Sequence, residues 1–552
     1  MNRLILLFIL TYGFCNLYSA DPDQSLTESA INIDGSVGLN AASYQVSGIS
    51  PRDRDFRYSL SGAVNAKIFG INFPFSMIVS EQQSAYTQPS NQIGVSPAYK
   101  WITLHGGWRS LSYSPFSLAG HTFLGGGIDL MPGLFRISAM YGRFNKANSG
   151  ADSLSLYTPP SYARSGFAAK LGFGSQTNYF DLIVLKASDD STSLKAGQTL
   201  IKPEENMVLA ISGKFNPFSS IFFELDAASS FYTNDIRSEI IADSSLPVFV
   251  SPIKSIFQYK TSSQFSTAIQ TSIGWRSSLF GIKLAYKRID PDYKSMGNYF
   301  MESDVENILI APNLNLFDRS LSLTGSFGFQ RDNLMNTKAQ QSQRLISSAG
   351  ISFNKPEYGI DLKYSSYGIT QYKGLNPLID SLKIARVNSS FNGSARYSFQ
   401  TDSLMNLIML IAGYQTLADL NSRTAATSQS DNYMANLAYQ GNLLSSGLNF
   451  GVSINYIQSL TSGNKMEFLG PSAQIGKTIE QFNIGASVSY QIQTINSVSN
   501  GGTASANIQV SYQISKHHSV NANINIINSG SSQALSPAFT EYRSNVGYIY
   551  NF

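Results

Sequence analysis

Apolar and polar residues alternate with a period of two over most of this chain, and no other feature of the sequence constrains the fold as strongly. The alternation is most regular within residues 502–515. There, every even position from Ala504 to Ile514 is apolar, and every odd position from Ser505 to Ser515 is neutral and polar. A period of two is the side-chain repeat of a β-strand that has one apolar face and one wet face. The sequence therefore predicts an all-β protein.

The alternating segments are too long for an ordinary soluble sheet. Most run for about 10 to 16 residues, whereas strands of soluble proteins cluster near five or six. A tilted strand that crosses a bilayer needs about 9 to 11 residues. The composition, with 43% hydrophobic and 13% charged residues, excludes a disordered chain. A helical membrane protein is also excluded, because no apolar run of about 20 residues follows the start of the chain.

The connections between the segments alternate in length. Short turns are predicted at 69–70 and 132–133, for example, while longer polar stretches cover 147–161, 188–205 and 293–304. β-Barrels of bacterial outer membranes have this asymmetry, with short turns on the periplasmic side and long loops outside. A soluble secreted protein of several β-domains, such as an adhesin, would explain the alternation but not this asymmetry of the connections.

The last residues strengthen the membrane interpretation. Asn545, Gly547, Tyr550 and Phe552 place a polar residue, a glycine, a hydrophobic residue and a terminal aromatic residue at fixed spacing. This segment resembles the C-terminal assembly signal of bacterial outer-membrane β-barrel proteins. The resemblance implies that the barrel assembly machinery reads these four residues and that outer-membrane lipid surrounds the folded protein.

We therefore predict a single transmembrane antiparallel up-and-down β-barrel over residues 31–552. Counting each alternating run as one strand gives about 26 strands, within a range of roughly 22 to 28. The number must be even if both ends of the barrel lie in the periplasm. Residues 21–30 would then form a short periplasmic segment before the first strand.

Residues 1–20 have the features of a secretory signal peptide. Arg3 precedes an apolar core from Leu4 to Leu10, and the small residues Ser19 and Ala20 end the segment. Cys15 is the only cysteine of the chain. Removal of this segment would leave a mature protein that contains no disulfide. Export of this kind fits a Gram-negative bacterium.

A second stretch of the sequence supports the location but no activity. Residues 96–144 contain two of the three tryptophans and the run Gly125–Gly127, which predicts a bulge or a close backbone approach. This stretch is similar to a segment of large outer-membrane barrels from Bacteroidota whose role is not established. The resemblance implies an outer-membrane location and nothing about chemistry.

A barrel of this size encloses an aqueous space, because channels already open at 16 to 18 strands. The inward face would be built of Asn, Ser, Gln, Gly and Thr, with a few charges that set a local field. The candidate lumen-lining residues are Glu224, Asp226, Asn507, Gln509, Asn523 and Arg543.

An open lumen of this width would leak, so something is expected to fill or cap it. The predicted extracellular loop 234–261 is the best internal candidate, because it is rich in apolar residues that seldom remain exposed to water. Its alternatives are an extra extracellular hairpin that extends the wall and a contact site for a partner protein. The candidate plug or partner-contact residues are Leu246, Val248, Phe249, Ile253 and Phe257.

One set of residues is a candidate for hydrolytic catalysis. His105 and His121 could form a hydrolytic set with Ser110, Ser112, Ser114 or Asp129, but no recognised spacing supports it. The sequence thus predicts no enzyme. It also predicts no metal and no cofactor, because these two histidines lie on separate predicted strands without a pattern of paired carboxylates.

The sequence favours a channel or translocation pore for solutes or polymers. The alternative is a structural, assembly or secretion-associated barrel whose lumen is closed and which serves as a platform for partner proteins. A plug or secretion partner is compatible with either interpretation. Nucleic acid is not expected as a partner, because the net charge is only +4 and the basic residues form no block.

Overall fold

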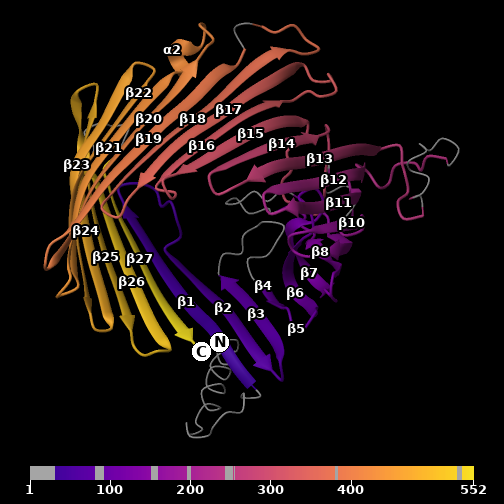
Figure 1. The fold of residues 1–552 in the computed structure, drawn as a ribbon, viewed down its shortest axis with the longest axis horizontal. Coiled ribbons are helices and arrows are strands. Elements are labelled where there is room, and N and C mark those ends of the chain that lie inside the picture. The colour runs from indigo at the N-terminus through magenta and orange to yellow at the C-terminus, as the bar shows by residue number, and fades with distance from the viewer. Residues whose placement is uncertain are drawn as a thin grey trace.

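The computed structural model describes residues 31–80, 92–150, 160–194, 201–242, 253, 255–379, 383–530 and 537–552. Over these residues the chain forms one antiparallel sheet, which closes because β1 (Ile31–Ser47) pairs with β27 (Phe539–Asn551) (Figure 1). The described part also contains the four-residue helix α2 (Ala425–Ser428). None of the described helices has the length and apolarity to cross a membrane. The predicted all-β class is confirmed.

Each strand pairs with its sequence neighbours, which gives the up-and-down order. The first half of the wall consists of β2 (Phe56–Ile68), β3 (Ile71–Ser80), β4 (Gln92–Val95), β5 (Ala98–Tyr99), β6 (Ile102–Ser112), β7 (Ala119–Leu130), β8 (Phe135–Asn145), β9 (Arg164–Gly174), β10 (Tyr179–Asp189), β11 (Glu205–Phe218), β12 (Ile221–Thr233), β13 (Ser263–Arg276) and β14 (Phe280–Ile289).

The second half runs from β15 to β27. Its remaining strands are β15 (Val305–Leu316), β16 (Leu321–Arg331), β17 (Gln340–Asn354), β18 (Tyr358–Lys373), β19 (Ala385–Gln400), β20 (Leu404–Asp419), β21 (Ser430–Leu443), β22 (Leu448–Thr461), β23 (Asn464–Ile479), β24 (Phe482–Ile495), β25 (Val498–Gln513) and β26 (His518–Gly530).

The short strands β4 and β5 share one place in the wall. Both pair with β3 on one side and with β6 on the other. Pro97 separates them, and proline has no backbone N–H to donate to the ladder. Taken together they make one interrupted strand, so the barrel has 26 strands, as predicted.

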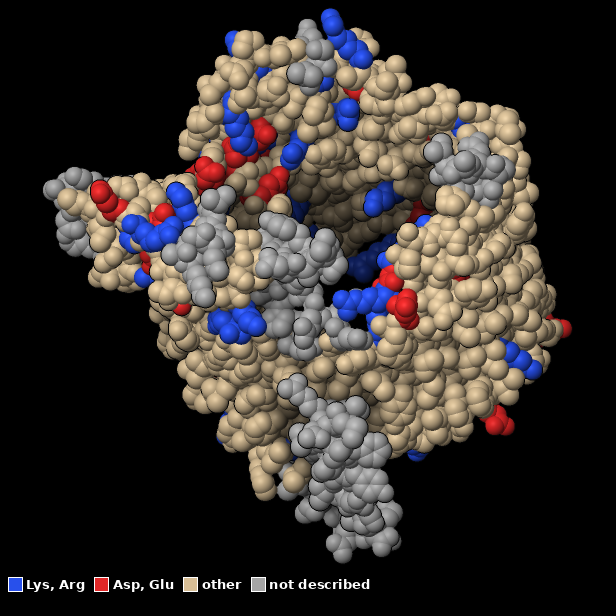
Figure 2. All heavy atoms as spheres, turned by 180° about the vertical axis from the view of Figure 1, so that it is seen from behind, with Lys and Arg blue, Asp and Glu red and all other residues tan. Residues whose placement is uncertain are grey.

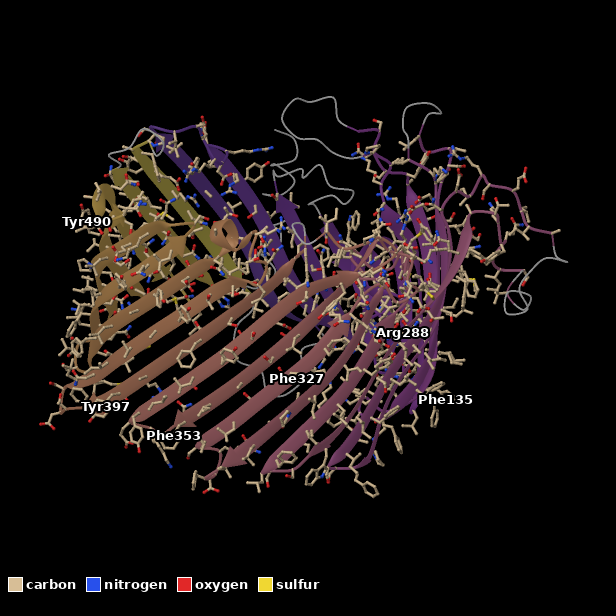
Figure 3. All side chains as sticks on the ribbon, turned by 90° about the horizontal axis from the view of Figure 1, so that it is seen from above. Phe135, Arg288, Phe327, Phe353, Tyr397 and Tyr490 are labelled. Carbon is tan, nitrogen blue, oxygen red and sulfur yellow. The ribbon has the colours of Figure 1, made fainter. Side chains whose placement is uncertain are left out.

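The outward face is apolar and exposed in the isolated chain. Directly paired residues share a face of a sheet, so the registers place Leu182, Leu284 and Leu437 outward, where each is about half exposed. Exposed aromatic rings gather at the edge with the short turns, where Figure 3 labels Phe135 and Tyr397. An apolar band with aromatic residues at its edge is the surface that a bilayer requires.

The closing seam has its own side-chain network on the inward side. Tyr44 of β1 is buried and donates a hydrogen bond from its hydroxyl to Oε2 of Glu541 on β27, at 3.3 Å. The guanidinium of Arg543 forms an ion pair with the same carboxylate at 2.5 Å and lies over the Tyr44 ring. These contacts add to the ladder of backbone hydrogen bonds that joins β1 and β27.

The closure predicts a specific cross-link. Ser43 and Ser544 lie directly opposite each other on the outward side of the seam, so their Cβ atoms are within about 5.5 Å. The double variant Ser43→Cys/Ser544→Cys, in a Cys15→Ser background, should oxidise to an intramolecular disulfide and migrate as a closed species on gels. The control pair Leu39→Cys/Ser544→Cys is offset by four residues, about 13 Å along the strand, and should not cross-link.

A row of glycines crosses five neighbouring wall strands on the inward face. Gly94 pairs with Gly107, Gly107 with Gly125, Gly125 with Gly142, and Gly142 with Gly166. A Cβ atom added at any of them would lie within 2.8 Å of a neighbouring atom. The close backbone approach predicted for Gly125 is thereby confirmed.

The glycine row makes room for aromatic rings on the lumenal side. A Cβ at Gly142 would lie 2.8 Å from Cδ2 of Phe123, and one at Gly166 would lie 2.8 Å from Cε2 of Phe144. Both rings are fully buried. The missing side chains along this row therefore leave room for an apolar cluster that packs against the lumenal face of the wall.

We predict that Gly142→Ala lowers the stability of the barrel. The new methyl group meets both the Phe123 ring and the backbone oxygen of Leu124 at 2.8 Å, and overpacking of this kind costs about 1–3 kcal/mol. The temperature at which the folded form converts to the slower heat-denatured band on a detergent gel should fall. Gly106→Ala is the matched control, because its nearest neighbour is a methyl carbon of Val95 at 3.7 Å. Equal midpoints for the two variants would contradict the packing argument.

Candidate functional site: the lumenal wall and its in-folded loops

Ion pairs line the lumenal wall between β8 and β14. Arg136 and Asp181 form a two-pronged pair, with Nε to Oδ1 at 2.9 Å and Nη2 to Oδ2 at 3.0 Å. The Asp181 side chain is only 2% exposed, and a bidentate pair of this kind is among the stronger polar contacts in proteins. The pair joins β8 to β10 on the lumenal face, near the short turns.

The predicted lumenal carboxylates lie in the same region. Glu224 forms ion pairs with Lys214 at 2.9 Å and Lys283 at 3.7 Å, and it accepts a hydrogen bond from Ser272. Asp226 lies two residues farther along β12 on the same face, and its Oδ1 has no hydrogen-bond partner among the described residues. The charges on this side of the lumen are thus mostly compensated.

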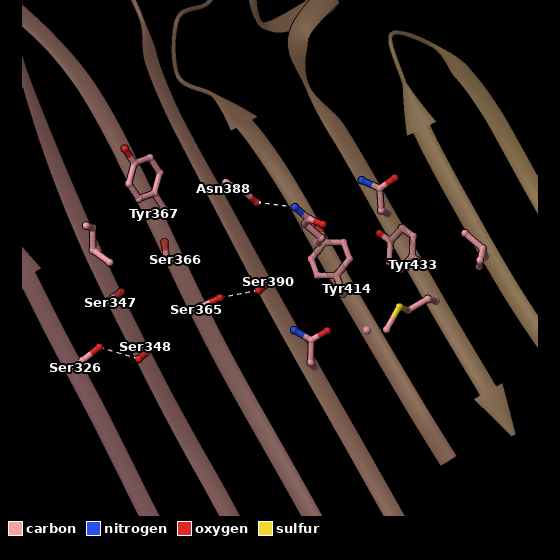
Figure 4. Close-up of a pocket in the computed structure, with 17 residues that line it drawn as sticks. Ser326, Ser347, Ser348, Ser365, Ser366, Tyr367, Asn388, Ser390, Tyr414 and Tyr433 are labelled. Carbon is pink, nitrogen blue, oxygen red and sulfur yellow. Dashed lines mark hydrogen bonds between the residues drawn. The ribbon is translucent and has the colours of Figure 1, made fainter. Parts of the chain in front are cut away.

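The opposite wall, from β16 to β22, is neutral where it is hollowed. A hollow of about 480 Å³ is lined there by serine, asparagine and glutamine residues together with Tyr367, Tyr414, Tyr433, Ile346, Met434 and Ile457, and none of its described lining residues is charged. Neutral side chains pair across neighbouring strands along its floor. These pairs are Ser326 with Ser348, Ser365 with Ser390, and Gln415 with Asn388 (Figure 4).

The remaining predicted lumen-lining residues continue this wall toward the seam. Asn507 and Gln509 of β25 and Asn523 of β26 lie on the inward alternation, and Nδ2 of Asn523 donates to Oδ1 of Asn507 at 3.4 Å. Arg543 lies on the same face, opposite Asn525. The structure therefore places all six predicted lumenal residues on the inner face, on two separate sectors of the wall.

Two long connections fold into the lumen and cover the inner face of β6 to β15. They are residues 113–118, between β6 and β7, and residues 290–304, between β14 and β15. The Tyr293 hydroxyl donates to the carbonyl of Phe116 at 2.7 Å, and burial raises the pKa of this phenol, which keeps it a donor. The buried apolar cluster includes Phe116, Leu118, Phe123, Met140, Phe144, Leu185, Val208, Tyr293 and Met296.

Asn206 of β11 anchors the second in-folded connection. Its side chain is fully buried; Nδ2 donates to Oγ of Ser230 at 2.9 Å and to the carbonyl of Lys294 at 3.3 Å, while Oδ1 accepts from the backbone N–H of Met296 at 3.0 Å. One amide thus joins the wall to two backbone groups of the loop. Buried backbone groups of this kind are costly to leave unpaired.

Replacing this amide should release the loop. In Asn206→Leu the Met296 N–H loses its acceptor, and the Lys294 carbonyl loses one of its two hydrogen bonds. An unpaired polar group of this kind costs about 1–3 kcal/mol at a buried site. We expect greater protease sensitivity within 290–304 and a larger single-channel conductance than in the wild type. Asn507→Leu, which removes a lumenal amide that contacts no described loop residue, should leave both measurements unchanged.

The structure corrects the plug interpretation of loop 234–261 for the residues that it describes. Phe257 is fully buried against Met207 and Phe231, and Ile253 packs on the same cluster. Met207 and Phe231 are directly paired and belong to the outward alternation of β11 and β12. At Ile253 and Phe257 the loop therefore covers the outside of the wall and does not enter the lumen.

Two further details concern this loop. The ammonium of Lys186, another outward residue, donates to the carbonyl of Ile256 at 2.7 Å, and one antiparallel bridge joins Ile240 to Lys260. The bridge continues the β12–β13 hairpin, as the alternative of an extended hairpin expects. The other three candidate plug residues, Leu246, Val248 and Phe249, lie outside the described residues.

The four residues of the predicted assembly signal lie on the closing strand. Asn545 pairs with Ala42 of β1, and Gly547 pairs with Asn40. A Cβ at Gly547 would lie 2.3 Å from Oδ1 of Asn521, so the glycine leaves room for that amide. The ring of Tyr550 lies 4.9 Å from that of Phe552 in an edge-on contact, and the backbone N–H of Phe552 donates to Gly35.

The histidines have different environments. His105 lies between Ser96, whose Oγ is 2.8 Å from Nδ1, and Asp129, whose Oδ2 is 2.9 Å from Nε2. His121 instead stacks on the ring of Tyr299, with centroids 4.0 Å apart. Of the hydrolytic set considered from the sequence, the structure brings together His105 and Asp129 and adds Ser96.

Sequence reasoning missed Ser96 and the in-folded connections. The signal for the connections was present, because apolar residues such as Phe116, Leu118, Tyr293 and Met296 stand between strands, where solvent-exposed loops are polar. Ser96 carried no signal, because its contact with His105 depends on the interruption between β4 and β5. Within the described ranges, no group of three His, Cys, Asp or Glu residues could hold a metal ion.

Comparisons with known proteins give only distant structural similarity. No protein-family model matches the chain, and no curated protein is similar to it. Among solved structures, an FrpB iron transporter from Neisseria meningitidis is 11% identical over 94% of this chain and 82% of its own, with a TM-score of 0.39. The outer-membrane protein OpdK from Pseudomonas aeruginosa, solved with vanillate, is 11% identical over 64% of this chain and 93% of its own, with a TM-score of 0.30.

The class of the protein follows from its own geometry. A closed antiparallel wall leaves no unpaired strand edge, the outward face is apolar, and the inward face carries hydroxyl, amide and ion-paired groups. In hydrocarbon only a helix or a closed barrel pairs all of its backbone N–H and C=O groups. Spanning barrels of this kind are found in outer membranes. The chain is an integral outer-membrane β-barrel protein.

Proposed function

We propose that the barrel is a pore that admits neutral, hydrophilic solutes or polymer chains across the outer membrane. The observation that carries the proposal is the uncharged hydroxyl and amide surface on the inner wall of β16 to β22, with its hollow of about 480 Å³. Such groups exchange hydrogen bonds with water or with hydroxylated solutes at little net cost. A fixed charge of one sign would instead favour ions of the opposite sign.

The in-folded connections support a narrowed pore. Among the described residues, they cover the inner face of β6 to β15. Figure 2 shows a deep hollow in the molecule, with blue and red side chains along its walls. A 26-stranded wall without such material would enclose a wider space. On this proposal the loops reduce the width of the channel while the neutral sector remains accessible.

The proposed orientation places both ends of the barrel and all short turns in the periplasm, with the long connections outside. It is supported by the alternation of short and long connections along the chain. Outer-membrane lipid surrounds the apolar band, and the assembly machinery acts on the closing strand that carries Asn545, Gly547, Tyr550 and Phe552.

A platform for a partner protein is the second candidate. Large apolar side chains are exposed on the long connections, with Phe300 at 83% and Ile240 at 62%. Exposed apolar residues on long loops are favourable contact points for another chain. A plug or secretion partner that binds there would close the lumen, and the barrel alone would then serve as its anchor.

Conductance measured with a thiol-labelled lumen separates the two candidates. In a Cys15→Ser background, Ser390→Cys points into the neutral hollow, whereas Ser389→Cys is its outward neighbour. Planar bilayers should show channels for both variants, and a bulky thiol reagent should reduce the current only through Ser390→Cys. Neutral oligosaccharides should enter liposomes that contain the wild-type barrel.

The opposite results would favour the platform. If the folded barrel forms no channels and admits no neutral solute, its lumen is closed without a partner. If labelling lowers the current equally at both positions, the neutral hollow does not line the conducting path.

A further inference from the structure

A three-residue hydrogen-bond chain lies on the lumenal side of the interrupted wall strand. The Oγ of Ser96 is 2.8 Å from Nδ1 of His105, and Nε2 of His105 is 2.9 Å from Oδ2 of Asp129. The His105 side chain is only 9% exposed, and that of Asp129 is 24% exposed. The contacts lie within hydrogen-bond reach of the kind that links a nucleophile, a base and a carboxylate.

The register of the wall produces this arrangement. His105 and Asp129 lie two residues apart in register on the same inward face, because Thr103 pairs with Asp129 and His105 pairs with Gly127. Gly127 has no side chain to separate them. Ser96 lies in the gap between β4 and β5, where its backbone N–H donates to the carbonyl of Pro74 at 3.0 Å and holds the serine in place.

The hydrogen-bond pattern sets the roles of the two nitrogens. The Asp129 carboxylate can only accept a hydrogen bond, so Nε2 of His105 carries the hydrogen and donates it to Asp129, while Nδ1 presents its lone pair to the Ser96 hydroxyl. The imidazole is thereby oriented as a base toward the serine, with the carboxylate placed to stabilise the imidazolium. The two nitrogens are exchanged relative to the serine-protease arrangement, but in either tautomer the unprotonated ring nitrogen can accept a proton.

Two of these three residues, Ser96 and His105, line a small polar cavity, and Asp129 lies behind His105. Ser96 and His105 line a space of about 360 Å³ together with Arg109, Ser76 and Gln92. Arg109 donates from Nε to the carbonyl of Val95 and from its two terminal nitrogens to Ser76 and Pro74. These contacts use three of its five N–H groups.

The remaining N–H groups of Arg109 give the cavity a donor for developing negative charge. A positive group that faces a tetrahedral intermediate stabilises its oxyanion, and such stabilisation is often the largest single contribution to catalysis. The cavity thus presents a nucleophile, a base and a cation, and the carboxylate of Asp129 orients the base from behind. These are the parts that ester hydrolysis requires.

We propose that this cavity hydrolyses carboxylic esters of short acyl groups carried by polar molecules, such as acylated saccharides that enter the lumen. Its lining is dominated by hydroxyl, amide and charged side chains, and only Trp108 and Leu111 are apolar. A long acyl chain would therefore bury polar groups of the cavity without a hydrogen-bond partner, which is unfavourable. The activity goes beyond the proposed pore function and belongs to a separate sector of the wall.

The reaction balances with water as the only co-reactant. Ser96 Oγ attacks the ester carbonyl as its proton passes to His105 Nδ1; the bond between the acyl carbon and the alcohol oxygen then breaks, and the alcohol leaves with that proton. Water attacks the acyl-serine and gives a proton to Nδ1. The bond between the acyl carbon and Oγ breaks, Ser96 recovers the proton, and the carboxylic acid is released.

The test uses the full barrel, folded in detergent, with a fluorophosphonate probe and two p-nitrophenyl esters. The wild type should be labelled, and it should hydrolyse the acetate at least tenfold faster than the palmitate. Ser96→Ala should abolish labelling and lower acetate hydrolysis about 100-fold or more, and His105→Gln should have a similar effect. Ser505→Ala, which replaces a lumenal serine on β25, should behave as the wild type.

Asp129 acts through His105 and is a positioning residue, so its test needs a finer readout. Asp129→Asn should lower kcat while KM stays near the wild-type value, and Asp129→Glu should restore part of the loss. Heat-dependent gel mobility confirms that each variant is folded. An unlabelled and inactive wild type, or a folded Ser96→Ala variant that keeps its label and its activity, would overturn the proposal.

Discussion

The pairing of β1 with β27 is the interaction on which the rest of the molecule depends. A strand in hydrocarbon has no water to satisfy its N–H and C=O groups, so any unpaired edge is costly, and the sheet spans a membrane only as a closed ring. The seam therefore carries side-chain contacts in addition to its backbone ladder, with Tyr44, Glu541 and Arg543 joined on the inner side. Once the ring is closed, one face of every strand is committed to lipid and the other to the lumen, and the function must be built on the second face.

Much of the wall could be predicted from the sequence because the barrel repeats one local rule. Alternation with a period of two reports strand, face and length at once, which is why the count of 26 and the even parity are confirmed. At Pro97 the structure shows two short pieces, β4 and β5, that fill one place in the wall and count as one strand. The alternation of residues does not predict whether a long connection packs inside the lumen or on the outer wall. The loop around Phe257 packs on the outer wall, whereas residues 290–304 pack inside.

The candidate site was less accessible to sequence reasoning than the wall. Alternation alone is enough to assign Glu224 or Asn507 to the inner face. A contact such as Ser96 with His105 depends on the register between strands and on a break in one of them. The neutral hollow has the same origin, because its hydrogen-bonded serines, Ser326, Ser348, Ser365 and Ser390, lie on four neighbouring strands and only the ladder brings them together. Residue type predicts the chemistry available to a barrel, and register decides which groups meet.

The aligned glycines of β4 to β9 have a consequence for how the size of such a protein is judged. Where neighbouring strands lack Cβ atoms on the concave side, the sheet can turn more tightly there than elsewhere, so its outline need not be a circle. The number of strands then sets the perimeter of the barrel but not the cross-sectional area of its lumen. Two barrels of equal perimeter could differ several-fold in permeability if the sheet of one of them bends sharply along such a row.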